Sequence, residues 1–202
     1  RLQWWYDWVS DLAPGRSSGA PIADALAEVV LRHDLDREAL AASVLARSAD
    51  DAFPPGGGAP SARLRGLGRA APAMWRVACV LGQRTAGPSD NDYVTQAGLA
   101  LDAVREGMRL QARRAHHAAA EPAARAEIEM ALSVSRHALA AARRLAPAAS
   151  ATVRRASLPV ALVGPYLRAL QEAADDPGRP VADILPLTRV WRLGVSRFTG
   201  SF

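Results

Sequence analysis

Two pairs of carboxylates in the chain are spaced so that each pair would share one face of a helix. Asp102 and Glu106 stand four residues apart, and so do Asp7 and Asp11. Side chains at this spacing are neighbours on a helix surface. Mg²⁺ binds carboxylate oxygens together with the phosphates of a substrate. The chemistry that such pairs could perform is therefore metal-assisted departure or transfer of a phosphate group.

The surroundings of the first pair oppose a metal ion. Arg105, Arg109 and Arg113 lie on the same stretch as Asp102 and Glu106 and bring positive charge to it. Oppositely charged side chains three or four residues apart on a helix attract one another. The sequence therefore predicts that Asp102 pairs with Arg105 or Arg109, although the acidic pair could bind one ion weakly.

The other residues that could do chemistry lack suitable partners. Adjacent histidines point apart on a helix, and a single histidine has no second ligand at a useful spacing. The lone cysteine excludes an internal disulfide and, within its apolar stretch, is predicted to be a buried thiol. The glycine run lacks the Lys-Ser/Thr ending of a phosphate-binding loop. These residues are His116 and His117, His33, His137, Cys79 in Trp75–Leu81, and Gly56–Gly58.

The composition describes a basic protein with enough apolar residues for a core. Half of the 202 residues are hydrophobic, the formal net charge is +5, and all 25 basic residues are arginine. Such a charge fits an acidic partner, which could be RNA, an anionic membrane surface or an acidic protein. The arginines are scattered along the predicted helices, which favours a solvated basic face over a nucleic-acid-binding arm. No run approaches the roughly 20 apolar residues that cross a bilayer.

Apolar residues recur at helical spacing almost throughout, and no alternation typical of a strand is present. We predict an all-α, single-domain antiparallel helical bundle over residues 1–202, with a flexible Pro/Gly loop at 53–60. Asp34 or Asp36 could cap the third helix, and Gly82 could end the fourth. The predicted helices cover residues 1–13, 21–32, about 37–51, 61–81 with a kink at Pro72, 92–117, 122–145, 159–174 and 181–198.

Several stretches, in order along the chain, resemble the squalene and phytoene synthase family. The opening RLQWW resembles the start of the helix that follows the family's first aspartate-rich motif. Gly98–Arg105 resembles the helix of its second motif, and the last stretches resemble its closing pattern. The stretches that carry the resemblance are Arg1–Trp5, Pro21–Leu26, Leu35–Leu40, Ala46–Arg47, Asp50–Asp51, Gly98–Arg105, Leu158–Leu167 and Ile184–Arg192.

The resemblance implies a bundle of the isoprenoid-synthase type, N-terminally shortened, because the first acidic helix would precede Arg1. The family's second motif would fall on Arg105, Glu106 and Leu110, so leucine replaces its distal carboxylate. Asp102 and Glu106 are then a degenerate remnant of that motif. The Asp7 and Asp11 pair follows the RLQWW element, whereas the family motif precedes it, so we predict no metal role for these two residues. We predict no catalytic residue, no metal ligand and no cofactor.

The opening and closing patterns are most similar to the family's complex I assembly factors. The resemblance implies a non-enzymatic, pseudoenzyme-like protein acting in assembly or structure of mitochondrial respiratory complex I, on the matrix side of the inner membrane. Its protein partners would be complex I subunits or assembly intermediates. Peripheral contact with the inner membrane and contact with RNA are further possibilities. Three alternatives stay open: a structural subunit of another large mitochondrial assembly such as the ribosome, an active Mg²⁺-dependent head-to-head prenyl diphosphate synthase, and a bacterial cytoplasmic setting.

Overall fold

The computed structural model describes residues 2–51, 69–83, 85–116, 121–175 and 184–199 of the chain. Within these ranges the regular structure is helical throughout, and no strand is present. The prediction of an all-α fold is therefore confirmed. The predicted loop at 53–60 lies outside the described residues.

The chain divides into two compact units, Arg1–Gly57 and Gly58–Phe202. Each unit has a hydrophobic core formed by its own residues. The assignment of the whole chain to a single domain stays a prediction.

The described residues of the first unit form three helices, α1 (Leu2–Ser10), α2 (Pro21–Arg32) and α3 (Arg37–Asp51). Trp8 is buried in its core and donates a hydrogen bond from Nε1 to the carbonyl oxygen of Ala23 at 3.3 Å. The side chain of Trp4 is 44% exposed, and its ring stacks on that of Trp8. The tryptophan spacing identifies an apolar face, but only part of that face is covered. The core residues are Trp8, Leu12, Ala23, Ala27 and Val30.

Two aspartates fix the turns of the first unit. Asp36 accepts a hydrogen bond from the backbone N–H of Ala39 at 3.0 Å, so it caps α3 as predicted. Asp24, in the first turn of α2, accepts hydrogen bonds from the backbone and hydroxyl of Ser18 and from the hydroxyl of Ser17. The bond from the Ser18 backbone, followed by those from the two hydroxyls, lowers the pKa of the Asp24 carboxyl. These contacts hold the α1–α2 loop against the start of α2.

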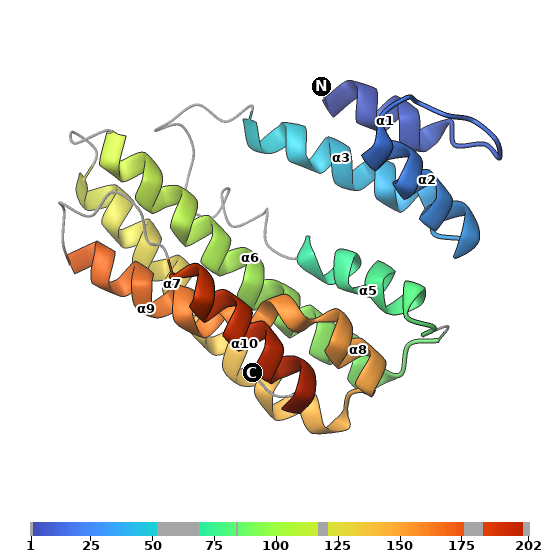
Figure 1. The fold of residues 1–202 in the computed structure, drawn as a ribbon. Helices are drawn as coiled ribbons and strands as arrows, with labels where there is room; N and C mark the ends of the chain where they lie inside the picture. Colours follow the sequence, from blue (N-terminus) through green and yellow to red (C-terminus); the bar gives the residue numbers. More distant parts are fainter. Residues whose placement is uncertain (1, 52–68, 84, 117–120, 176–183, 200–202) are drawn as a thin grey trace. The chain divides into compact units, whose positions relative to one another are not determined.

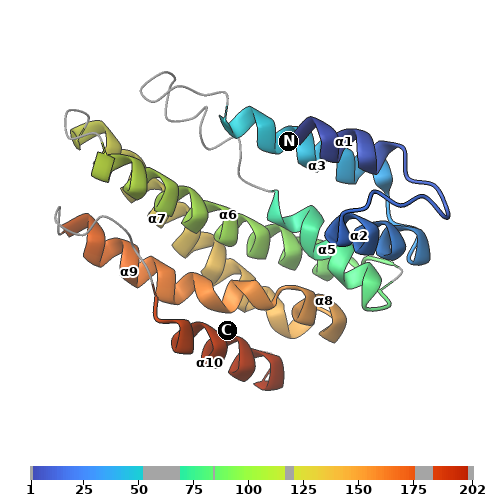
Figure 2. The same ribbon diagram turned by 45° about the horizontal axis from the view of Figure 1, so that its top comes forward.

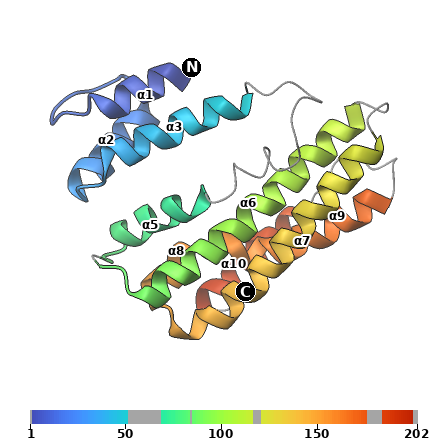
Figure 3. The same ribbon diagram turned by 180° about the vertical axis from the view of Figure 1, so that it is seen from behind.

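The second unit is built on two long helices, α6 (Pro88–His116) and α7 (Glu121–Leu145), which lie side by side and run antiparallel (Figures 1 and 3). Helix α9 (Val163–Asp175) packs against both of them. Helix α5 (Ala70–Val80) packs against α6 and the short helix α8 (Ala151–Ala156). The last helix, α10 (Pro186–Thr199), packs chiefly on the 3₁₀ turn η4 (Leu158–Leu162) at the edge of the bundle (Figure 2). A second 3₁₀ turn, η3, spans Ala146–Ala148.

Small residues allow α5 and α6 to approach closely. Ala97 and Ala100 on α6 are fully buried, and a Cβ added to Gly98 would lie 2.5 Å from the backbone nitrogen of Ala71. Real Cβ atoms do not come this close to backbone, so only glycine fits at this crossing. The crossing fixes the position of α5 on the bundle.

The helix boundaries differ from the predicted ones where proline stands. Helix α6 begins at Pro88 rather than near residue 92, and Pro72 lies in the first turn of α5, where proline is tolerated, so it causes no kink there. The helix predicted at 159–174 is divided into η4 and α9, and α8 was not predicted.

Gly82 follows α5 with φ +100°, which confirms its place at the helix end. Cys79, predicted to be buried, is only half-buried.

Among the described residues, none of the helices combines the length and the apolar character that crossing a membrane requires.

Candidate functional site

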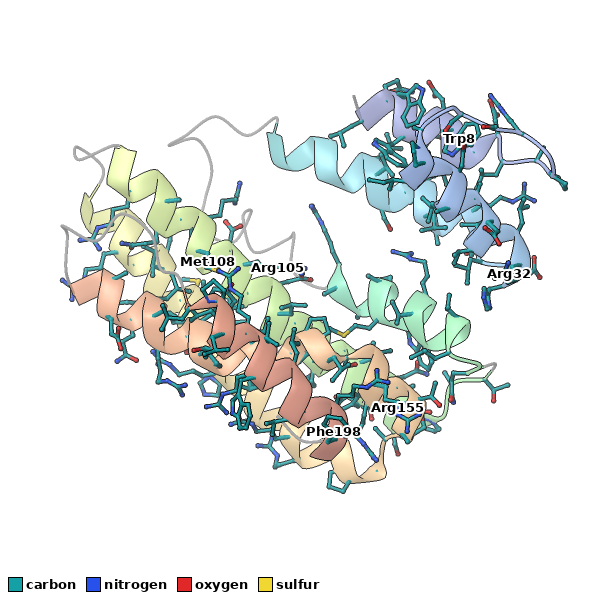
Figure 4. The ribbon with its side chains drawn as sticks, in the orientation of Figure 1. Trp8, Arg32, Arg105, Met108, Arg155 and Phe198 are labelled. Atoms are coloured by element: carbon teal, nitrogen blue, oxygen red, sulfur yellow. The ribbon has the colours of Figure 1, made fainter. Side chains whose placement is uncertain are left out.

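Helix α6 carries the predicted acidic remnant in its middle. Asp102 and Glu106 lie one turn apart, and their side chains are only 10% and 13% exposed. Arg105, labelled in Figure 4, lies between them in sequence and is largely exposed. The two carboxylates therefore share a sheltered part of the second unit, as their spacing predicts.

The carboxylate of Asp102 caps another helix. Its Oδ2 accepts a hydrogen bond from the backbone N–H of Ala70, the first residue of α5, at 2.8 Å. The residue before α5, Arg69, offers no side-chain cap of its own. The first N–H groups of a helix lack intrahelical partners and attract negative charge. Asp102 supplies that partner from 32 residues further along the chain.

The carboxylate of Glu106 is held by an arginine. Arg109 donates from Nε to Glu106 Oε2 at 2.8 Å and from an Nη to Oε1 at 2.6 Å. This bidentate geometry is the stronger form of a carboxylate–arginine contact. An ion that bound Glu106 would have to displace Arg109 from both oxygens.

Asp102 lies within ion-pair distance of Arg105, one of the two arginines predicted to pair with it. The closest Nη of Arg105 lies 4.0 Å from Asp102 Oδ1, whereas the described contact of Arg109 is with Glu106. The side chain of Arg113 lies outside the described residues. Three charged partners thus surround the acidic pair: the N-terminus of α5, Arg105 and Arg109. The α5 N–H and Arg109 donate hydrogen bonds to carboxylate oxygens that a metal would otherwise bind, and Arg105 adds a positive charge 4.0 Å from Asp102.

Leu110 occupies the position at which the family motif would place its distal aspartate. Its side chain is 5% exposed and belongs to the core of the second unit. A carboxylate here would be transferred from water into an apolar environment, which is costly unless the charge is paired. Leucine therefore stands in place of the motif's aspartate at a position that is buried in the core.

The other acidic pair, in α1 and just after it, is engaged locally and at the surface. Asp7 accepts a hydrogen bond from Nε2 of Gln3 at 2.8 Å. Asp11 is largely exposed and lies 3.7 Å from an Nη of Arg16. Asp7 and Asp11 therefore make contacts of an ordinary solvated helix face.

The remaining candidates are not brought together in the described part of the chain. No group of three His, Cys, Asp or Glu side chains with metal-binding geometry is present there. His137 is exposed and its Nδ1 lies 2.8 Å from the carbonyl oxygen of Ser133 on its own helix. The side chain of His116 and all of His117 and Gly56–Gly58 lie outside the described residues.

The sequence did not reveal that Asp102 would cap α5. The only available signal was the absence of Ser, Thr, Asp or Asn immediately before Ala70, which leaves the cap to be supplied from elsewhere. The partner in a tertiary cap depends on how the helices pack, and helical spacing does not encode that.

Comparison with protein-family models, with curated proteins and with solved structures gave no match to this chain.

Proposed function

We propose that the chain is a non-catalytic relative of the squalene and phytoene synthases that acts in assembly or structure of mitochondrial respiratory complex I. The proposal rests on the order of the sequence stretches that resemble this family. In this reading the protein lies on the matrix side of the inner membrane, and its helical surface recognises complex I subunits or assembly intermediates.

The observation that carries the non-catalytic part is the use made of the acidic pair. In a prenyl synthase, carboxylates on facing helices hold Mg²⁺ ions that neutralise the departing diphosphate. Here Asp102 accepts the first N–H of α5, and Glu106 is held at both oxygens by Arg109. These contacts support a structural role for both residues.

Turnover tests the non-catalytic part of the proposal. The protein is incubated with farnesyl or geranylgeranyl diphosphate and Mg²⁺, and the extract is analysed for head-to-head condensation products. We expect none. A product formed by the unmodified protein and lost in the Asp102→Asn/Glu106→Gln variant would overturn the proposal in favour of an active synthase.

Partner capture tests the assembly part. The tagged protein is isolated under native conditions from the cells that encode it, and co-purifying proteins are identified. We expect complex I subunits, and their enrichment should persist in the Glu106→Gln variant, because recognition would occur on the outer helical surface. Enrichment of ribosomal proteins, with steep loss as salt is raised, would favour an RNA-associated role instead.

A further inference from the structure

Helix α10 exposes most of its apolar side chains, although Leu193 is half-buried. Leu187, Trp191 and Phe198 are 78%, 69% and 88% exposed, and Val190 is 68% exposed. Their spacing places them along one side of the helix. Space around Gly194, in the same helix, is open. A continuous apolar surface of this kind on a folded protein indicates an interaction site. We call these four side chains, with Val195, the α10 apolar face.

The side of α10 that meets the bundle is the more polar one. Ser196 is buried there, and the guanidinium of Arg189 lies 5.8 Å from the ring centre of Tyr166 on α9. A helix that covered a core would be expected to turn its apolar side inward. Helix α10 has the opposite orientation, so its Trp and Phe rings do not cover the core of the second unit. Phe198 is labelled in Figure 4.

The charge of this region is entirely positive. Residues 184–202 contain three arginines and no acidic residue. Arg192 and Arg197 are exposed, and helical spacing places them on the two flanks of the α10 apolar face. Long cationic side chains at such flanks can extend to lipid phosphates while the apolar side chains enter the membrane.

We propose that the α10 apolar face binds the surface of an anionic lipid membrane. Leu187, Trp191 and Phe198 insert at the boundary between head groups and acyl chains, and Arg192 and Arg197 contact lipid phosphates. Trp at this depth is typical of membrane interfaces. This inference does not depend on the proposed role in complex I.

Charge complementarity distinguishes a lipid surface from a second copy of the chain. Two α10 faces packed on one another would bring Arg192 and Arg197 of both copies together, with no acidic residue in residues 184–202 to neutralise them. Like charges that meet in an interface are repulsive. An anionic bilayer offers both the apolar interior and the negative charge that this helix needs.

Partition onto vesicles tests the proposal with the full chain. Sucrose-loaded vesicles of phosphatidylcholine, with or without phosphatidylglycerol, are sedimented with the protein. We expect binding to the anionic vesicles and much weaker binding to the neutral ones. The Trp191→Ser/Phe198→Ser variant should bind at least about tenfold more weakly, because two large apolar side chains no longer insert.

Matched variants distinguish binding through the α10 apolar face from the effect of removing any exposed apolar or cationic side chain. Ile22→Ser removes an equally exposed apolar side chain from α2 and should leave binding unchanged. Arg192→Gln/Arg197→Gln should weaken binding to anionic vesicles by about tenfold or more, since each cation contributes roughly fivefold near an anionic surface. Arg136→Gln/Arg144→Gln removes the same charge from exposed positions on α7 and should have a clearly smaller effect.

A second readout does not require the serine variants to fold. Lipids brominated on their acyl chains should quench part of the protein's tryptophan fluorescence, and Trp191→Phe should remove that quenched part. Failure to bind anionic vesicles, or equal loss of binding in Ile22→Ser, would overturn the proposal. So would a dimer in solution that Trp191→Ser/Phe198→Ser converts to a monomer while vesicle binding is retained.

Discussion

Asp102 illustrates how one residue type at one spacing can serve two different purposes. A carboxylate on a helix face can bind a metal, but it can equally satisfy the free N–H groups at the start of a neighbouring helix. In this chain the second use is observed, because α5 begins beside α6 at the level of Asp102. The same contact explains why Arg69, which is no capping residue, can precede α5.

Replacing Asp102 should destabilise the second unit through this cap. Asp102→Ala leaves the Ala70 N–H without its acceptor, and we expect a loss of about 1 to 2 kcal/mol in the free energy of unfolding. Asp102→Asn keeps an oxygen acceptor but loses the charge, so it should cost less. Urea denaturation followed by circular dichroism measures both. An alanine variant as stable as the unmodified protein would contradict the capping role.

Tyr93 provides a prediction at alkaline pH. Its ring is fully buried in the second unit, and burial raises the pKa of the phenol to about 12, against a weaker opposing effect from Ser157 and Arg154. The unfolded chain loses this proton near pH 10, while the folded chain retains it. The unfolding free energy should therefore fall by roughly 2 kcal/mol as pH rises from 10 to 12.

The absence of lysine makes this measurement unusually clear, because no ammonium group titrates in the same range. Denaturation curves recorded across this pH range should lose most of their pH dependence in Tyr93→Phe. Tyr166→Phe removes a half-exposed phenol from the same unit and serves as the control. If both variants retained the decline in stability, Tyr93 would not be its source.

At the level of helices, the sequence predicted most of what the structure contains. The spacing of apolar residues located α2, α6, α7 and α10, and Pro and Gly marked many of their ends. The prediction missed two short elements. The 3₁₀ turn η4 has Pro159 at its start, and α8, with six residues, is too short to show a full apolar period.

The orientation of α10 could not be predicted from its pattern. An amphipathic helix has the same periodicity whether its apolar side faces a core or faces outward. The sequence predicted a helix at 181–198, but that Trp191 and Phe198 are exposed while Ser196 is buried is seen only in the structure.

The crossing of α5 and α6 gives a prediction at this scale. In an exposed helix, Gly→Ala usually stabilises by about 1 kcal/mol. At Gly98 the added Cβ would meet the backbone of Ala71 at 2.5 Å, so we expect Gly98→Ala to destabilise by about 1 to 3 kcal/mol.

Gly194→Ala in α10 is the matched control for this substitution. A Cβ at Gly194 meets open space, so the variant should be neutral or slightly more stable. Thermal unfolding of the two variants measures the difference. Equal stability of both would show that α5 does not approach α6 as closely as the structure indicates.

At the level of the whole molecule, the described residues form two hydrophobic cores of unequal size. The larger core draws all its residues from α5 to α9 and the segments that connect them, and the smaller one draws on α1, α2 and the residues beside them. Folding stability grows with the apolar surface that a unit buries, and units near 60 residues are marginal. The second unit should therefore carry most of the stability.

A fragment comprising residues 58–202 should fold without the first unit. We expect a helical circular dichroism spectrum and a cooperative thermal transition, because the core around Leu110, Ile128 and Leu170 is complete within the fragment. Residues 1–57 alone should unfold at a lower temperature or lack a transition. Leu110→Asp in the larger fragment returns an acid to the family's motif position, yet it should abolish the transition because it buries an uncompensated charge. A cooperative transition in that variant, or none in the parent fragment, would contradict the position of Leu110 in an independent core.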